Sequence, residues 1–212
     1  MKPLLPERTV ERLSLYRRIL LNYQYLDHAY IFSHNLARFL KTNAATVRRD
    51  LMLIGVEGNL HKGYVISELV EKINEAIDPD RTEKVAFIGI GELGRAVYEY
   101  FNQNDARLQV AATFRFGSQT GNQIEDIPCY NMVNLPTVIN KSGIKICVVA
   151  VTLDYVKEIS TILAHSGVLG ILNFSSALLQ LPPHIYVENY DMITKLEKIA
   201  YFMNKAGNIS NQ

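Results

Sequence analysis

Three closely spaced glycines, Gly89, Gly91 and Gly94, are the residues whose spacing points most directly to chemistry. In a G-x-G-x-x-G loop the first glycine permits a tight turn, the second lets the backbone approach a pyrophosphate, and the third lets a helix pack against a strand. Free N–H groups at the start of that helix would bind phosphate. The loop consists of Gly89, Ile90, Gly91, Glu92, Leu93 and Gly94. It predicts a dinucleotide site, with a purely structural turn or a coenzyme A site as alternatives.

The strand expected after this loop and its helix ends at Arg115, in "VAATFRFGSQ". Dinucleotide sites commonly carry an acid at this position, which holds the adenosine ribose. An acid would repel a 2′-phosphate, whereas an arginine would accept one or stack on adenine. NADP is therefore an option beside NAD, unless Arg115 simply faces solvent.

The sequence shows no set of side chains with catalytic or metal-binding spacing. Its histidines are scattered at positions 28, 34, 61, 165 and 184, none paired with a cysteine, serine or carboxylate at useful spacing. A dehydrogenase would also need a substrate domain, and beyond Asn189 the chain offers little more than one helix. We therefore expect a protein that binds a nucleotide but is not an enzyme, with no catalytic residue and no metal.

From Lys84 onward, apolar strands alternate with helical stretches. Strands are expected at 85–90, 109–114, 144–151 and 168–174, and helices at 92–101, 132–141 and 154–166. Runs such as "ICVVAV" lack polar alternation, as strands buried on both faces of a parallel sheet do. The pattern predicts an α/β fold, a Rossmann-like doubly wound parallel sheet, with the glycine loop after its first strand.

The residues before this sheet have the pattern of a winged helix-turn-helix. Helical spacing runs from Thr9 to Tyr23, Ser33 can cap a short second helix, and Asn43 can cap a third, "AATVRRDLMLI". The short turn "KTN" joins the last two into a helix-turn-helix. "GVEGNLHKGYVI" then predicts a β-hairpin wing, and a further helix starts at Ser67. "DPDRT", residues 78–82, is the expected domain boundary.

Charge is divided unevenly along the chain. The first 49 residues carry nine lysines and arginines against three acids, whereas the whole chain carries 22 and 21. This favours a polyanion as the partner of the N-terminal region, although a solvated basic face would give the same counts. The composition is that of a globular protein, without a transmembrane or signal segment. Two cysteines without a CxxC pair predict a cytoplasmic location.

The last helical stretch begins after Asp191, a good N-cap residue. Its apolar positions, 192, 193, 196 and 199–203, cover more than the single stripe of a surface helix. Such a helix needs cover on two sides, most simply from a second subunit. A homodimer is therefore expected, with deep burial within one chain as the competing interpretation.

In combination these motifs resemble the Rex family of redox-sensing transcriptional repressors. The likeness rests on "ATVRRDL" and "KGY" in the winged helix, followed in the same order by "IGIGELGRAV", "GILNF" and "VENYDM". It covers nearly the whole chain. The resemblance implies a homodimer that binds operator DNA when NAD⁺ prevails and releases it when NADH fills the site. It also implies that the C-terminal helix is swapped between subunits.

The resemblance assigns roles to individual residues. Thr46, Arg48 and Arg49 would face the major groove, where arginine can pair bidentately with guanine. Arg38 and Lys41 would contact phosphates. The residues implied to bind DNA are Arg12, Arg38, Lys41, Asn43, Thr46, Arg48, Arg49 and Lys62.

Arg12, Tyr100 and Asp191 would couple the cofactor to DNA. Core packing for Tyr100 and a helix cap for Asp191 are the alternatives. The residues expected to bind the cofactor are Gly89, Ile90, Gly91, Glu92, Leu93, Gly94, Tyr100, Arg115 and Asp191.

The chain departs from the family pattern at several places. The family wing usually reads G-[KR]-R-G-x-G-Y, whereas "GNLHKGY" has Leu60 in place of a minor-groove arginine and leaves Lys62 to compensate. Arg115 replaces the family acid. "AVTLDYV" lacks the usual Thr-Val-Pro and "NFSS" the usual proline, so the cofactor pocket is expected to differ in detail.

Three regions are thus expected: a winged-helix DNA-binding domain at 1–78, a Rossmann-like NAD(H)-binding domain at 83–190, and a C-terminal dimerisation helix at 191–212. The predicted function is a repressor that senses the ratio of NADH to NAD⁺. The alternatives are a small NAD(P)-dependent oxidoreductase and a coenzyme A-binding regulator, each with a basic N-terminal extension.

Overall fold

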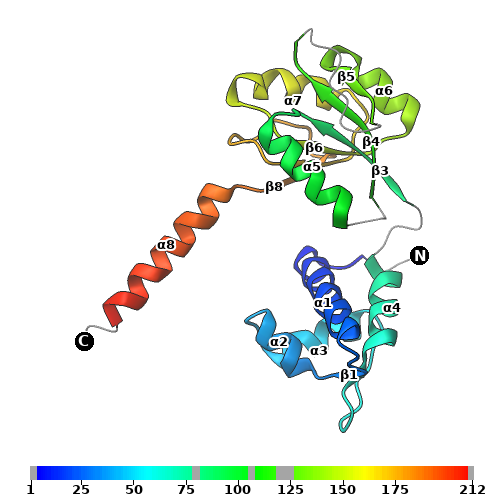
Figure 1. Cartoon of the computed structure of the whole chain (residues 1–212), viewed down its shortest axis with the longest axis vertical. Helices are drawn as coiled ribbons and strands as arrows, with labels where there is room; N and C mark the ends of the chain where they lie inside the picture. The colour runs from blue at the N-terminus through cyan, green and yellow to red at the C-terminus, as the bar shows by residue number, and fades with distance from the viewer. Residues whose placement is uncertain (1–3, 78–81, 105–107, 118–126, 210–212) are drawn as a thin grey trace. The chain divides into compact units, whose positions relative to one another are not determined.

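The computed structural model describes residues 4–77, 82–104, 108–117 and 127–209. The chain forms two compact units, Met1–Asp80 and Arg81–Gln212, and each is described by itself (Figure 1). Of the predicted boundary segment at 78–82, residues 78–81 lie outside the described residues.

The N-terminal unit consists of four helices and a two-stranded sheet. Its elements are α1 (Glu7–Tyr25), β1 (Tyr30–Ile31), α2 (Ser33–Phe39), α3 (Ala44–Leu53), β2 (Tyr64–Val65) and α4 (Ile66–Ile77). α1 packs against α4 and α2 against α3, and the apolar stripes of the helices share one core. Its fully buried members include Leu13, Leu20, Leu36, Val47, Leu51 and Ile73. α2 and α3 form the predicted helix-turn-helix.

The predicted starts of two helices are wrong by one residue. α2 begins at Ser33 with Phe32 at its N-cap position, so Ser33 does not cap the helix. The Ser33 hydroxyl instead accepts a hydrogen bond from Arg48 Nη1 at 3.3 Å, across the helix-turn-helix. α4 begins at Ile66 rather than Ser67 because the buried Ile66 side chain is already part of the core.

The wing is a tight reversal closed by a single bridge. Asn59 and Gly63 exchange two backbone hydrogen bonds of 2.8 Å each. The strand-like "YVI" of the predicted hairpin forms β2 with its first two residues only, because Ile66 begins α4. β2 pairs antiparallel with β1, which the sequence pattern did not reveal. The base of the wing is therefore fixed against a segment that precedes the helix-turn-helix.

The C-terminal unit is a doubly wound sheet, as predicted. Its strands are β3 (Glu83–Ile88), β4 (Leu108–Arg115), β5 (Cys129–Asn131), β6 (Ile146–Val149), β7 (Gly170–Asn173) and β8 (Tyr186–Asn189). In the described part they pair in parallel in the order β5-β4-β3-β6-β7-β8. This is the order of dinucleotide-binding sheets, in which the direction of winding reverses between β3 and β6.

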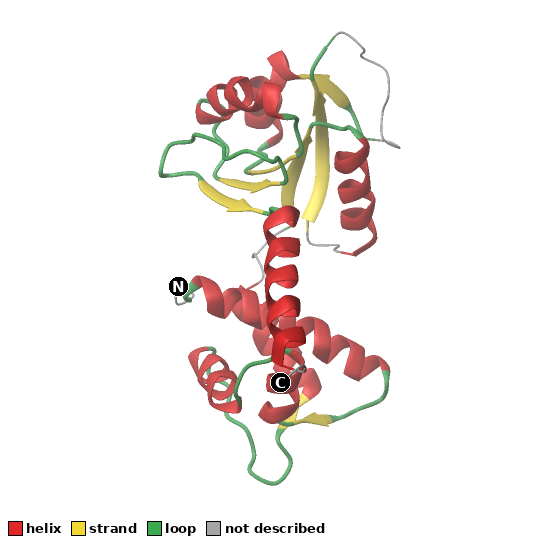
Figure 2. Cartoon of the chain, turned by 90° about the vertical axis from the view of Figure 1, so that its left-hand side faces the viewer, coloured by secondary structure: helices red, strands yellow, loops and turns green. Residues whose placement is uncertain are grey.

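Helices cover both faces of this sheet (Figure 2). They are α5 (Glu92–Asn104), α6 (Leu135–Ser142) and α7 (Val156–Ala164). Val85 and Phe87 of β3 join α5 in one buried cluster, whereas Ala86 and Ile88 join α6 and α7 in the other. The division follows from the alternation of side chains along a strand. Cys147 of β6 lies in the second cluster and is fully buried.

The last helix, α8 (Met192–Ile209), follows β8 (Figure 1), and its described apolar side chains are exposed. Ile193, Leu196, Ile199, Phe202 and Met203 are each between 59% and 65% exposed. Deep burial of this helix within one chain does not match that exposure. No helix in the described part of the chain combines the length and apolar content needed to cross a membrane.

Candidate nucleotide and DNA-binding sites

A cleft of about 560 Å³ lies at the carboxyl ends of β3, β4 and β6. Its lining residues are Gly89, Ile90, Gly91, Arg115, Phe116, Gly117, Ala150, Val151, Thr152 and Tyr155. In open α/β sheets, ligands bind in the crevice outside the strand ends where the winding reverses. The fold therefore places four predicted cofactor residues, Gly89, Ile90, Gly91 and Arg115, at one such crevice.

The three glycines of the loop differ in what a side chain at each position would meet. Gly89 has φ +86°, and a side chain there would collide with the carbonyl oxygen of Ala150, the residue that follows β6. A side chain at Gly94 would collide with the Gly89 carbonyl oxygen, so the first turn of α5 could not pack as closely. Gly91 is different, because a side chain there would meet nothing within 4 Å. That open space, directly before the N-terminus of α5, suits a pyrophosphate. Glu92 and Leu93 are exposed beside it.

Arg115 is the last residue of β4, is half-buried and lines the cleft. It therefore shares the cleft lining with Gly91, at the position that commonly reads the adenosine ribose. A solvent-facing position away from the site, the alternative considered from the sequence, does not match this placement.

Five predicted cofactor residues are not part of the cleft lining: Glu92, Leu93 and Gly94 of the loop, and Tyr100 and Asp191. Tyr100 on α5 is 56% exposed, which contradicts the core-packing alternative. Asp191 caps α8: one carboxylate oxygen accepts hydrogen bonds from Ile193 N at 2.9 Å and Thr194 N at 3.4 Å, and the other accepts one from the Thr194 hydroxyl at 2.6 Å. These bonds, that of the Thr194 side chain first, lower the pKa of Asp191. Roles for Tyr100 and Asp191 in coupling stay predictions.

A larger cavity, about 880 Å³, lies between α7 and the segment 178–182. It is lined largely by aliphatic side chains such as Val156 and Leu181, and it contains none of the loop glycines. The cavity includes Val156 and Lys157 at the start of α7, but it lacks the glycine loop that lets a backbone approach a pyrophosphate. The smaller cleft is therefore the candidate nucleotide site.

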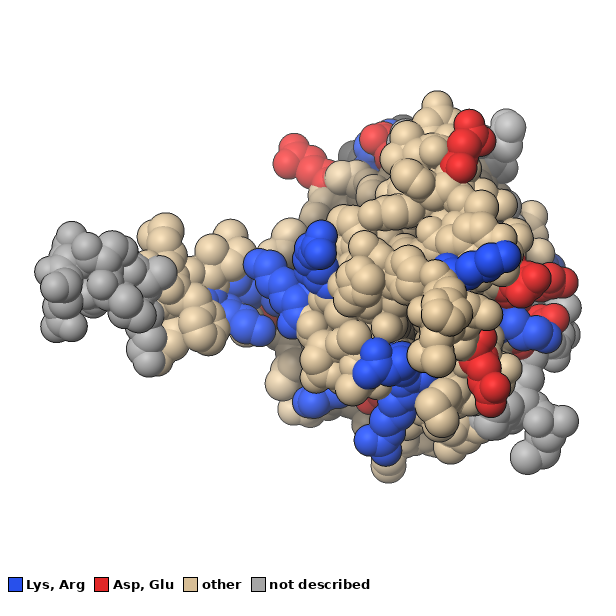
Figure 3. Space-filling model, turned by 90° about the horizontal axis from the view of Figure 1, so that it is seen from below, with Lys and Arg blue, Asp and Glu red and all other residues tan. Residues whose placement is uncertain are grey.

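The predicted DNA-reading residues lie at the surface of the helix-turn-helix. Arg48 and Arg49 of α3 are exposed, and Asn43 fixes the start of that helix by accepting hydrogen bonds from Thr46 N at 2.8 Å and the Thr46 hydroxyl at 3.1 Å. Arg38, Lys41 and Lys62 are exposed as well. Lys and Arg side chains gather on the face of the molecule that Figure 3 presents. Such a surface suits a phosphate backbone.

Arg12 has a partner that was not anticipated from the sequence. Its Nε and Nη2 atoms lie 2.6 and 2.7 Å from the two carboxylate oxygens of Asp50, a buried residue of α3. Asp50 also accepts hydrogen bonds from the Tyr16 hydroxyl at 2.9 Å and the Thr9 hydroxyl at 3.2 Å. The signal was present in the sequence, because Asp50 falls on the same helical face as Val47, where an acid needs a buried partner.

This cluster keeps Asp50 ionised inside the domain. Burial alone would raise the pKa of Asp50, but hydrogen bonds from Arg12 and Tyr16 outweigh burial and lower it. The bond to Asp50 raises the pKa of Arg12 in turn. Burial, followed by the bond to Asp50, raises the pKa of Tyr16. The recognition helix α3 is thus attached to α1 by a charge pair, while about a quarter of the Arg12 side chain, 26%, stays exposed.

The chain combines two features. The first is a winged helix with exposed arginines on α3, the second helix of its helix-turn-helix. The second is a parallel sheet whose glycine loop is open at Gly91. Together they define the class of DNA-binding regulators that respond to a nucleotide. Family models match both units. Residues 5–51 match "Putative DNA-binding protein N-terminus", and residues 80–177 match "CoA binding domain".

The chain belongs to the Rex family of redox-sensing transcriptional repressors. It is 31% identical over 208 residues to the redox-sensing transcriptional repressor Rex of Anoxybacillus flavithermus, with 98% of each chain covered. It is 32% identical over 204 residues to that of Streptococcus thermophilus, with 95% of this chain and 93% of the relative covered. The family resemblance inferred from the motifs is thereby confirmed.

Solved structures confirm the fold. The crystal structure of RSP, a Rex-family repressor, matches with a TM-score of 0.88 and 23% identity over 100% of both chains. RSP in complex with β-NAD⁺ and operator DNA matches with a TM-score of 0.86, covering 99% of this chain and 97% of that one. RSP in complex with β-NADH matches with a TM-score of 0.85, covering 99% of each.

Proposed function

We propose that this chain is a DNA-binding transcriptional repressor that senses the ratio of NADH to NAD⁺, holding its operator with NAD⁺ and releasing it with NADH. The observation that carries the proposal is the 31% identity to a redox-sensing repressor over 98% of the chain. The same chain has exposed arginines on α3 and a glycine loop that is open at Gly91. Because these relatives are named repressors and not enzymes, we propose no turnover of the cofactor.

On the DNA side, α3 enters the major groove. Arg48 and Arg49 are exposed there and can each pair bidentately with guanine, which gives sequence discrimination. Arg38 and Lys41 hold phosphates, which fixes the register without reading sequence. Lys62 adds a cation at the wing. A homodimer would present two such helices to half-sites about one helical turn apart.

On the cofactor side, the pyrophosphate lies against Gly91 and the N-terminus of α5. The loop fits this group, because the space beside Gly91 is open while Gly89 and Gly94 pack against backbone. Arg115 lies where the adenosine ribose binds and would tolerate a 2′-phosphate. We propose NAD⁺ and NADH as the physiological ligands, with NADP(H) accepted to a degree that an acid at this position would not allow.

The switch requires that NADH bind with different affinities to the DNA-bound and the DNA-free states of the protein. A ligand moves such an equilibrium only by its differential affinity, and operator DNA must weaken NADH binding by the same factor. We propose that Asp191, Tyr100 and Arg12 carry this coupling, with α8 crossing to a partner subunit. Arg12 donates through Nε and Nη2 to Asp50 of its own unit, and its side chain stays 26% exposed, so a second carboxylate could still approach it. A repressor of this kind would act in the cytoplasm, where Cys129 and Cys147 stay free thiols.

The decisive experiment is a DNA-binding titration with NAD⁺, NADH and NADPH present in turn. We expect binding to an operator palindrome with NAD⁺ and release with NADH. The reciprocal measurement, NADH affinity with and without operator, must give the same factor. DNA binding that is indifferent to both nucleotides would refute the proposal, as would accumulation of oxidised cofactor with a small carbonyl compound.

A coenzyme A-responsive regulator is the second candidate, favoured by the "CoA binding domain" match over residues 80–177. Coenzyme A also has a pyrophosphate, which the Gly91 loop could hold. Calorimetric titration with coenzyme A and NADH separates the two candidates. If coenzyme A binds tightly and NADH does not bind, the coenzyme A-responsive regulator replaces the NADH-sensing repressor as the function.

A further inference from the structure

Two aromatic side chains, Phe116 and Tyr155, form one wall of the nucleotide cleft. Their ring centroids are 4.0 Å apart and their planes are inclined by 17°, so the rings are stacked. Phe116 follows directly after β4, and Tyr155 lies in the short turn after β6. Since β3 lies between β4 and β6, the pair joins the two strand ends that flank the glycine loop.

The two rings have different surroundings. Phe116 is half-buried and packs against the core cluster that α6 and α7 share with the sheet. Tyr155 is 40% exposed. Phe116 therefore lies between Tyr155 and the core and holds the Tyr155 ring in place. Because the two ring centroids are 4.0 Å apart, no third ring fits between them. A ligand ring can stack on this wall only at the outer face of Tyr155.

The position of the wall along the cleft identifies the part of the ligand that it would meet. Pyrophosphate belongs at Gly91 and the N-terminus of α5, and the adenosine ribose belongs at the end of β4, where Arg115 lies. Phe116 is the next residue after Arg115. The base attached to that ribose would thus lie beside the aromatic pair, and every base has a face on which an aromatic ring can stack.

We propose that Tyr155, held in place by Phe116, reads the adenine of the cofactor by stacking. This rests on the proposed function in so far as it takes the ligand of the cleft to be a dinucleotide. Stacking supplies affinity at the adenosine end, where the chain has an arginine in place of the ribose-binding acid. Unlike an acid, the stacked ring does not distinguish a 2′-hydroxyl from a 2′-phosphate, so it is compatible with both NADH and NADPH.

The test is calorimetric titration of the full chain with three probes: NADH, ADP-ribose, which lacks nicotinamide, and reduced nicotinamide mononucleotide, which lacks adenine. Tyr155→Ala should weaken NADH and ADP-ribose about fivefold or more, because base stacking is worth at least roughly that factor. Reduced nicotinamide mononucleotide should bind as before. Tyr155→Phe keeps the ring and should restore wild-type affinity, and Phe116→Ala should give a smaller loss with the same pattern.

Two further variants test whether the loss of affinity is specific to the aromatic ring of Tyr155. Tyr186→Ala removes an exposed tyrosine of β8 that does not line the cleft, and it should leave all three affinities unchanged. Tyr155→Leu keeps an apolar side chain without an aromatic face, so it still tests stacking if the alanine variant unfolds. Its loss for NADH and ADP-ribose should match that of Tyr155→Ala.

The outcomes separate this proposal from the proposed function. Wild-type affinity of Tyr155→Ala for ADP-ribose, or an equal loss for NADH and reduced nicotinamide mononucleotide, would overturn the stacking. A wild-type chain that binds neither NAD⁺ nor NADH would overturn the repressor proposal instead, and the ADP-ribose titrations would still decide on Tyr155. Failure of all three probes with the wild type would overturn both.

Discussion

The helices α3 and α8 differ in how their apolar side chains are covered. Val47, Asp50 and Leu51 of α3 are buried within their own unit. The Asp50 carboxylate accepts hydrogen bonds there from Arg12 and Tyr16. α8 exposes apolar side chains such as Ile199 and Phe202, which no described residue buries. α3 is thus complete within its own unit, whereas the apolar face of α8 still needs a cover.

The largest effect is expected at α8. Ile199→Asp should convert a dimer into a monomer, since burial of such a side chain is worth about 1.5–3 kcal/mol and a symmetric dimer has two copies. Sedimentation equilibrium measures the change. Lys198→Gln on the same helix is the matched control and should leave the dimer intact. If Ile199→Asp sediments as the wild type does, the exposed face of α8 is not the dimer interface.

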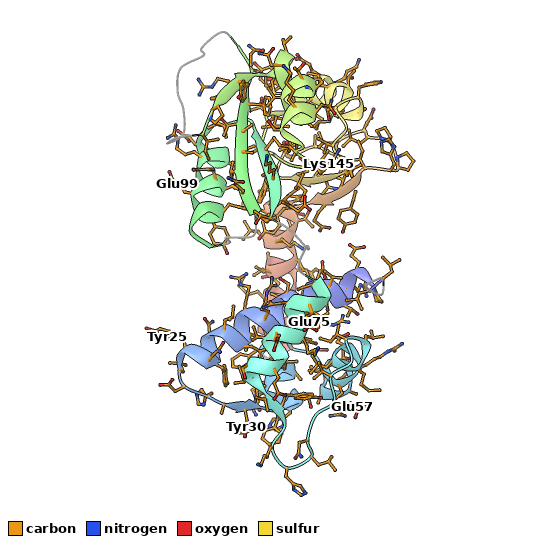
Figure 4. All side chains as sticks on the ribbon, turned by 90° about the vertical axis from the view of Figure 1, so that its right-hand side faces the viewer. Tyr25, Tyr30, Glu57, Glu75, Glu99 and Lys145 are labelled. Atoms are coloured by element: carbon orange, nitrogen blue, oxygen red, sulfur yellow. The ribbon has the colours of Figure 1, made fainter. Side chains whose placement is uncertain are left out.

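The next largest effect is expected at the charge pair of α3. Asp50→Ala should lower the free energy of unfolding by about 3 kcal/mol, at the low end for a broken buried pair because Arg12 is partly exposed. Urea unfolding at pH 7 measures it. Glu75→Ala breaks the exposed Lys72–Glu75 pair on α4 (Figure 4) and should cause no measurable change.

The same pair predicts a pH dependence. The pKa of Asp50 is lower in the folded chain than in the unfolded one, so its contribution is complete above the unfolded value, about 4, and is lost as the pH falls through the folded value. Asp50→Asn should therefore lose less stability than the wild type on acidification below about pH 4. An identical acid profile for both proteins would show that Asp50 does not carry this term.

Specific DNA binding should depend on the exposed face of α3. Arg48→Ala and Arg49→Ala should each cost about 1–3 kcal/mol of discrimination, because each removes a bidentate base contact. Lys41→Ala should weaken all sequences alike, since it removes a phosphate contact. Footprinting and fluorescence anisotropy on matched and scrambled operators distinguish these results. A normal footprint from the double arginine variant would mean that another element reads the operator.

Response to the cofactor should fail at the start of α8 without loss of the fold. Asp191→Ala removes the cap and the proposed coupling carboxylate, so DNA binding should become weak or indifferent to NADH, whereas coupling of about five- to 150-fold is typical. Circular dichroism checks the fold and a DNA titration with NADH checks the response. Normal release by NADH would reduce Asp191 to its capping role.

The smallest effect is expected at Arg115. Arg115→Asp places an acid beside the 2′-position and should weaken NADPH, through like-charge repulsion worth about 1 kcal/mol in an open cleft, more than it weakens NADH. Calorimetric titration with the two nucleotides measures the difference. Equal loss of both would show that residue 115 does not contact the ribose.

Elements with strong local signals were predicted correctly from the sequence. The glycine loop, the helix-turn-helix and the central strands follow from backbone requirements and apolar periodicity, which are properties of contiguous residues. β5 and β8 were missed because they are short and contain no fully buried residue that would mark them as strands. β1 was missed because its two residues become a strand only by pairing with β2.

Contacts between distant residues lay beyond a single sequence. Arg12 meets Asp50 only because α1 packs beside α3, and Phe116 meets Tyr155 only because β4 and β6 flank β3. The role of Arg115 was predicted from its place at the end of the strand after the glycine loop, and that of Asp191 from family likeness; their positions at the cleft and at the start of α8 are consistent with those roles. The coupling proposed for Arg12 and Asp191 has to take account of Asp50, which already binds the Arg12 guanidinium.

The burial of Cys147 in the sheet bears on how oxidation reaches this repressor. A thiol reacts with peroxide as its thiolate, and burial raises the pKa of Cys147 and keeps it protonated. The side chain is also fully shielded from dissolved oxidants. Oxidative stress would leave this residue chemically silent. The protein would therefore report the electron balance of metabolism through a reversible ligand and need no reductase to reset that sulfur.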